Sequence, residues 1–113
     1  MDAAERLARY ARLVVRVGAN VQLGQDVFVL AEVAHTAVAR AVAEEAYAVG
    51  ARRVVVTYVD QHVRRSEILH APDEALRSAY RYEIEQRLEL GERRGALISL
   101  TGPRSRISST TST

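Results

Sequence analysis

Residues 24–61 of the chain read GQDVFVLAEVAHTAVARAVAEEAYAVGARRVVVTYVDQ, and this stretch decides the fold. Two short apolar runs, at residues 27–30 and 54–56, enclose a segment whose valines and alanines recur at helical spacing. Continuous β-branched runs of this kind are typical of strands buried on both faces of a parallel sheet. Gly50 stands where the intervening helix is expected to end. Because a helix joins them, the two strands are expected to be parallel, with a right-handed crossover.

The segments on either side extend this unit to an incomplete layered α/β sheet with parallel strands, in the order helix-β-α-β-α-β. Strands are expected at residues 26–31, 53–59 and 95–100. Helices are expected at residues 2–17, 34–49, 60–70 and 72–91. The first helix should be amphipathic, because one side of it collects Leu7, Tyr10, Leu13, Val14 and Val17. Three strands are few for such a sheet, so one edge and part of a face are expected to stay uncovered.

The composition changes abruptly after residue 101. Residues 102–113, GPRSRISSTTST, hold one aliphatic residue in twelve and show no hydrophobic period. We therefore expect a partial α/β domain at residues 1–101 and a disordered Ser/Thr/Arg-rich tail at residues 102–113. One choice of codons for residues 106–113, read two bases later, encodes Asn-Leu-Phe-Asp-Asp-Leu-Asp. This alternative reading suggests the hypothesis that a frameshift ends the chain early.

Composition excludes several classes of function. The chain has 113 residues, enough for one domain, and its lack of cysteine excludes disulfides, thiolate chemistry and a Cys-based zinc site. All 16 basic residues are arginine, the net charge is only +2, and the arginines are interleaved with glutamates, so a nucleic-acid partner is not expected. No apolar run is long enough for a membrane span, and no signal peptide is visible. These features predict a cytoplasmic protein that does not bind membranes.

The loop after the first strand argues against a dinucleotide site. Such a site needs glycines between the first strand and its helix, and residues 32–36 contain none. Asp60, at the end of the second strand, is therefore interpreted as a turn or helix-cap residue rather than a ribose ligand. Glu32 and His35 follow the first strand at its carboxyl end, where α/β proteins place ligands.

The three histidines do not form a recognisable metal motif. A metal site on one helix needs two histidines four residues apart and a carboxylate, whereas His62 and His70 are eight apart and His35 lies on another element. Glu67 and Asp60 are close in sequence to His62, so a weak surface site remains an alternative. The favoured interpretation is that all three histidines are exposed to water at loops and helix ends.

Hydroxyl groups and paired acids offer no complete active site either. The hydroxyls of interest belong to Ser66, Ser99 and Thr101, and none lies in a nucleophile-elbow pattern. The paired acids are Glu44-Glu45 and Asp73-Glu74, which are expected to be solvated residues on helices. The residues themselves therefore indicate no catalytic, cofactor-binding or metal-binding position.

Several blocks of sequence nevertheless occur together in an informative order. They are LARYARLVVRVGANVQLGQDVFVLAE, ARAVAEEAYAVGARRVVVTYVDQHVRR, APDEAL and GALISLTG, between residues 7 and 102. With these blocks the chain resembles the N-terminal region of the thermophilic metallo-aminopeptidase family, the group of aminopeptidases T and S. One departure is Leu23, where a proline is usual in the turn.

The resemblance implies the N-terminal part of a larger, two-domain cytoplasmic enzyme that removes N-terminal residues from peptides and is a homodimer at full length. Two divalent metal ions, of zinc, cobalt, magnesium or manganese, would activate a water and polarise the scissile carbonyl. The family's metal ligands lie in its C-terminal domain, and no position of this chain matches them. The chain alone is therefore expected to bind no metal and to be inactive. The alternative is a small α/β binding or interaction module, without catalysis, that recruits a partner through its open sheet edge.

Overall fold

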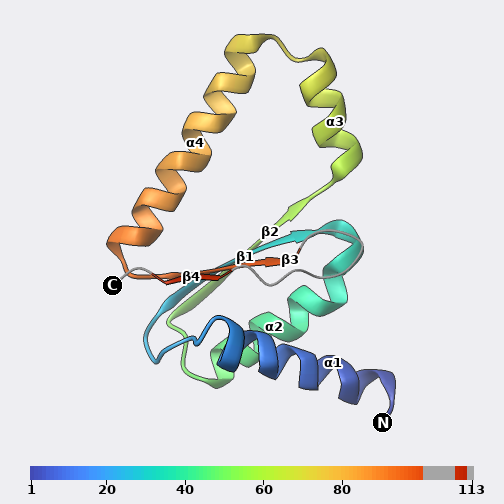
Figure 1. Cartoon of the computed structure of the whole chain (residues 1–113), viewed down its shortest axis with the longest axis vertical. Coiled ribbons are helices and arrows are strands. Elements are labelled where there is room, and N and C mark those ends of the chain that lie inside the picture. The colour runs from blue at the N-terminus through green and yellow to red at the C-terminus, as the bar shows by residue number, and fades with distance from the viewer. Residues whose placement is uncertain (101–108, 112–113) are drawn as a thin grey trace.

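A four-stranded sheet forms the centre of the computed structural model, which describes residues 1–100 and 109–111 (Figure 1). The strands are β1 (Asp26–Glu32), β2 (Arg53–Val59), β3 (Ala96–Leu100) and β4 (Ser109–Thr111), in the spatial order β2-β1-β3-β4. β1 pairs in parallel with both β2 and β3, whereas β4 is antiparallel to β3. The predicted α/β class with parallel strands is confirmed, and the three predicted strands lie within one or two residues of their expected bounds.

The helices divide between the two sides of the sheet. Along the chain they are α1 (Ala3–Arg12), the π-helical turn η1 (Leu13–Gly18), the 3-10 turn η2 (Val33–His35), α2 (Thr36–Ala48), α3 (Gln61–His70) and α4 (Asp73–Glu92). α1 and α2 lie together on one side of the sheet, whereas α3 and α4 project away from its other side (Figure 1). The charged segment at residues 60–70 is helical from Gln61 to His70, as predicted.

The hydrophobic core occupies only the side of the sheet covered by α1 and α2. Along β1, Val27, Val29 and Ala31 are buried, whereas Phe28 and Leu30 between them are only half-buried. The core side also receives Ala96, Ile98 and Leu100 from β3, and Ala11, Val14, Val15, Ala39, Val42 and Ala46 from the helices. The expectation of strands buried on both faces is therefore wrong for the described residues. The apolar runs are continuous, but in the described part of the chain only the last turn of α4, at Leu90, lies beside their second face.

The end of the first predicted helix differs from expectation because the helix widens. The N–H of Ala19 donates to the carbonyl of Val14 at 2.8 Å, a hydrogen bond spanning five residues. This wider turn brings Ala19 into the core after Val14 and Val15. Leu13 and Val17, predicted to face inward, are instead exposed. The prediction assumed about 3.6 residues per turn throughout, so it could not foresee that the wider turn changes which side chains face the core.

A network of main-chain and side-chain hydrogen bonds joins the segments before the strands. Gly50 ends α2 with φ +99°, as its position after the helix predicted, and its carbonyl accepts from the N–H of Gly24 at 2.7 Å. The N–H of Arg52 donates to the carbonyl of Gln25 at 2.8 Å. The side-chain amide of Gln25 in turn donates to the carbonyl of Arg94 at 2.9 Å, just before β3. These contacts hold the amino ends of all three parallel strands at one level.

Part of the segment expected to be disordered is a strand. Residues Ser109–Thr111 form β4, with Thr111 beside Ala96 and Ser109 beside Ile98. Threonine suits an extended backbone, and the outer edge of β3 offers unpaired N–H and C=O groups. Composition alone cannot reveal such a partner. The rest of the expected tail lies outside the described residues.

Candidate functional site

The carboxyl end of β1 is the place where this topology favours ligand binding. The chain leaves β1 towards β2 on one side, while β3 lies on the other side of β1. In open α/β sheets ligands bind where consecutive connections leave in opposite directions in this way. Glu32 ends β1 and η2 follows directly, shaped by a hydrogen bond of 2.7 Å from the hydroxyl of Thr36 to the carbonyl of Val33.

Three polar side chains meet at this position. Oε1 of Glu32 accepts a hydrogen bond of 3.0 Å from the side-chain amide of Gln61, the first residue of α3. Nε2 of His35 lies 3.7 Å from Oε2 of Glu32, and both side chains are mostly buried. The group therefore contains one carboxylate, one imidazole and one amide, drawn from two segments 29 residues apart.

This group does not fit a metal centre. Only Glu32 and His35 are metal-ligating side chains here, whereas catalytic zinc sites use three protein ligands. No three side chains of histidine, cysteine, aspartate or glutamate are placed to share a metal ion anywhere in residues 1–100 and 109–111. The donor set of the described residues therefore does not suit one divalent ion, and still less a pair.

The remaining predicted candidates lie along α3 or at its first residues. His62 and His70 are exposed on α3, as expected, and Glu67 is exposed as well. Asp60 caps α3 by accepting from the N–H of His62 at 2.9 Å, which confirms its interpretation as a helix cap. His35 is the exception to the predicted exposure, because it lies beside Glu32.

The two contacts of Glu32, with His35 and with Gln61, differ in how clearly the sequence predicts them. The spacing Glu32-x-x-His35 could have indicated that pair, since residues three apart on a helical turn are neighbours. The contribution of Gln61 has a weaker signal. It follows the second strand, whose carboxyl end lies beside that of the first.

The paired acids do not all behave alike. Glu45 forms a 2.7 Å ion pair with Arg16 of η1 and is half-buried, so the expectation that it is a solvated helix residue is wrong. Glu44, Asp73 and Glu74 are exposed as expected. Of the candidate hydroxyls, Ser66 is exposed on α3 and Ser99 is half-buried on β3, while Thr101 lies outside the described residues. None of these side chains joins the group at the end of β1.

A carboxylate with a lowered pKa, that of Asp26, lies at the opposite end of β1. Asp26 is only 7% exposed and accepts two hydrogen bonds from Arg52, at 2.7 and 2.6 Å. Arg93 approaches the same carboxylate at 3.8 Å. The hydrogen bond from Arg52 lowers the pKa of Asp26, against the opposing effect of burial. Because both oxygens already bind arginine at the amino end of the strand, this pair joins structural elements rather than forming a ligand site.

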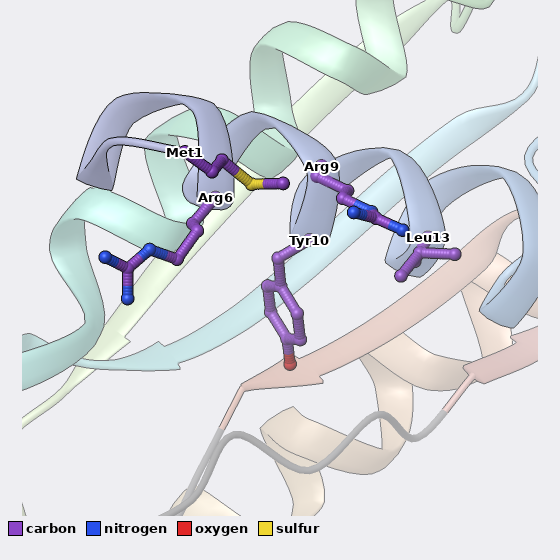
Figure 2. Close-up of a pocket in the computed structure, with 5 residues that line it drawn as sticks. All are labelled: Met1, Arg6, Arg9, Tyr10 and Leu13. Carbon is purple, nitrogen blue, oxygen red and sulfur yellow. The ribbon is translucent and has the colours of Figure 1, made fainter.

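A shallow hollow of about 500 Å³ runs along α1, and Figure 2 shows its lining. It contains Met1, Arg6, Arg9, Tyr10 and Leu13. Tyr10 reaches from α1 towards β3, and its hydroxyl is buried without a hydrogen-bond partner in the described part of the chain. The lining includes neither a carboxylate nor a histidine, so it offers no base or metal ligand for catalysis.

Comparison with known proteins gives matches to one protein family over nearly all of the chain. The thermophilic metalloprotease family (M29) matches residues 3–112. Aminopeptidase 2 of Geobacillus stearothermophilus is 33% identical over 99 residues, which are 88% of this chain and 24% of that protein. Aminopeptidase T of Thermus thermophilus is 40% identical over 80 residues, which are 70% of this chain and 20% of that protein.

A solved structure agrees with the sequence matches. Wild-type AmpT from Thermus thermophilus superposes on this chain with a TM-score of 0.73 and 32% identity, covering 89% of this chain and 25% of that one. The chain therefore spans about a quarter of the length of the relatives it matches.

Proposed function

The chain belongs to the thermophilic metalloprotease family M29, and we propose that it forms the N-terminal scaffold of a metal-dependent aminopeptidase that hydrolyses N-terminal residues from peptides. The observation that carries the proposal is the shared fold, since nearly all of this chain superposes on one quarter of an aminopeptidase. The peptidase activity is proposed for the longer polypeptide. The 113 residues alone are proposed to be inactive.

We propose that two divalent metal ions, of zinc, cobalt, magnesium or manganese, serve the complete enzyme and are held outside this scaffold. Support comes from the donor set at the end of β1, where Glu32 and His35 offer two ligands and Gln61 already occupies one carboxylate oxygen. The proposed role of the present residues is to hold a rigid sheet on which the catalytic part rests. No catalytic, cofactor-binding or metal-binding role is proposed for any residue of this chain.

We also propose that the complete enzyme takes peptide substrates, is a cytoplasmic homodimer and does not bind nucleic acid. Positive and negative side chains alternate along α4, where Arg77, Arg81 and Arg87 are interspersed with Glu74, Glu83, Glu85 and Glu89. Such alternation does not create the basic stripe that phosphate backbones require. No helix within residues 1–100 and 109–111 combines the length and the hydrophobicity that a membrane span needs.

Inactivity is tested by incubating the purified chain with a chromogenic leucyl substrate and added cobalt, zinc or magnesium. We expect release of the chromophore to equal that of a metal-only control. Turnover that rises with protein concentration and is abolished by a chelator would contradict the proposal.

The scaffold role is tested with a chimera in which residues 1–100 replace the corresponding part of aminopeptidase T. We expect the chimera to fold and to hydrolyse the leucyl substrate, while aminopeptidase T lacking that part stays inactive. A chimera that is folded by circular dichroism but inactive would overturn the proposed function. If the 113-residue chain forms a stable, folded dimer and the chimera has no activity, the two results together would favour the interaction module instead.

A further inference from the structure

Helices α3 and α4 form an arm that stands away from the rest of the molecule. They leave the sheet on the side opposite α1 and α2, approach one another with distance from the sheet, and are joined by a short turn far from it (Figure 1). The arm exposes an unusual number of large apolar side chains, namely Val63, Ile68, Leu69, Tyr82, Ile84 and Leu88. Isolated protein domains seldom leave so many apolar groups in water on one structure.

A groove of about 370 Å³ lies between the two helices and the end of β2. Its apolar lining comes from both helices and includes Val63 and Ile68 of α3 and Leu76 and Ala79 of α4. Val63 and Ile68 are 64% and 62% exposed. Covering these side chains with a second apolar surface would remove them from water, which is energetically favourable.

The rim of the groove is predominantly acidic. Asp60, Glu67 and Glu83 contribute three carboxylates, and Arg64 contributes a single guanidinium. None of the three acids forms an ion pair within residues 1–100 and 109–111, although Asp60 caps α3 through its Oδ1 atom. A segment with basic residues beside its apolar face would complement this rim.

We propose that the groove of the α3–α4 arm docks an apolar segment flanked by arginine or lysine, supplied by the polypeptide that the longer relatives carry beyond the region matched here. The inference rests on the proposed function. Its further support is that the relatives are about four times as long as their matched segment, so they have ample chain to cover the groove. The second face of the sheet, which the described helices leave open, lies on the same side as the arm (Figure 1).

The first test compares hydrogen exchange of the arm in the 113-residue chain and in the chimera described above. Exposed helices with few apolar contacts exchange readily, so we expect residues 61–92 to be about tenfold better protected in the chimera. Equal exchange in both proteins would overturn the proposal. Protection that appears in the free chain as its concentration rises, together with dimerisation, would assign the groove to a second copy and would also overturn it.

Two pairs of variants locate the contact. Val63→Asp should lower the melting temperature of the chimera but not that of the free chain, where Val63 is exposed. Val17→Asp, at an exposed valine of η1, should change neither. Glu83→Arg should likewise destabilise only the chimera, and less so at high salt. Its matched control is Glu85→Arg on the same helix, since Glu85 does not line the groove.

The outcomes of these tests separate the docking proposal from the proposed function. An active chimera that is indifferent to Val63→Asp and Glu83→Arg would overturn the docking site and leave the scaffold function standing. A folded, inactive chimera whose arm is protected from hydrogen exchange would overturn the scaffold function and leave the docking site standing.

Discussion

The carboxylate of Asp26 accepts two hydrogen bonds from the guanidinium of Arg52, from Nε to Oδ1 at 2.7 Å and from Nη2 to Oδ2 at 2.6 Å. Asp26 is the first residue of β1, and Arg52 immediately precedes β2. The planar guanidinium matches the carboxylate with two parallel bonds, so the pair fixes both distance and orientation. It therefore joins the amino ends of two neighbouring parallel strands.

Acid should weaken the fold through Asp26. Its pKa is lowered in the folded chain, mainly by the hydrogen bond from Arg52. The ionised pair therefore stabilises the fold above the unfolded pKa of about 3.9, and this contribution is lost as the pH falls through the lower, folded pKa. Asp26→Asn should be less stable than the wild type near neutral pH, and the difference should shrink in acid. Urea unfolding at a series of pH values measures this.

The control for this experiment is Glu85→Gln, at an exposed residue in the middle of α4, away from the ends of the helix dipole. Its unfolding midpoint should follow that of the wild type across the same pH series. If Asp26→Asn kept the full wild-type loss of stability in acid, another carboxylate would be responsible.

Shortening one of the two largest fully buried side chains of the core should be strongly destabilising. Ile98 is fully buried on β3, against the side of the sheet that α1 and α2 cover. Ile98→Ala should lower the free energy of unfolding by about 2–5 kcal/mol, because it removes apolar contacts and leaves a cavity. Val17→Ala, at an exposed valine, should change it by no more than about 0.5 kcal/mol. Similar effects of the two substitutions in chemical denaturation would show that the core lies elsewhere.

Removing one hydroxyl should expose the outer edge of the sheet. The hydroxyl of Tyr47 accepts a hydrogen bond of 3.0 Å from the N–H of Val54, on a strand that has only one neighbour among the described strands. Tyr47→Phe should reduce stability by about 1 kcal/mol or less and should increase self-association, because a free edge N–H can pair with another chain. Light scattering at raised concentration measures this. Tyr82→Phe, on α4, serves as the control, and association equal to that of the control would refute the prediction.

Alanine should be poorly tolerated at two left-handed glycines. Gly24 and Gly50 have φ angles of +79° and +99°, which an L side chain rarely adopts. Each substitution should reduce the free energy of unfolding by about 1–2 kcal/mol. An added Cβ at Gly24 meets open space, whereas at Gly50 it would meet the side chain of Leu23. Because Leu23 is exposed and can move, Gly50→Ala should be only slightly worse than Gly24→Ala. A neutral Gly24→Ala in thermal unfolding would contradict the assigned backbone conformation.

The group of side chains at the end of β1 could be predicted from the sequence only in part. Glu32 and His35 are recognisable from the sequence as the residues that follow the first strand. Their meeting with Gln61, however, requires β1 and β2 to lie side by side in register, with Glu32 opposite Val59. The sequence likewise contains both Arg16 and Glu45 without indicating that they form an ion pair across two helices.

The sequence by itself determined the order and type of the main elements, because apolar periodicity, glycine at a helix end and an aspartate cap act over a few neighbouring residues. Only the tertiary structure decided which face of the sheet is covered, how η1 turns the first helix, and where Ser109–Thr111 finds a partner. These features depend on contacts between segments far apart in the chain. The run at residues 27–30 places apolar side chains on both faces of β1, and only the position of the helices distinguishes the core from the open side.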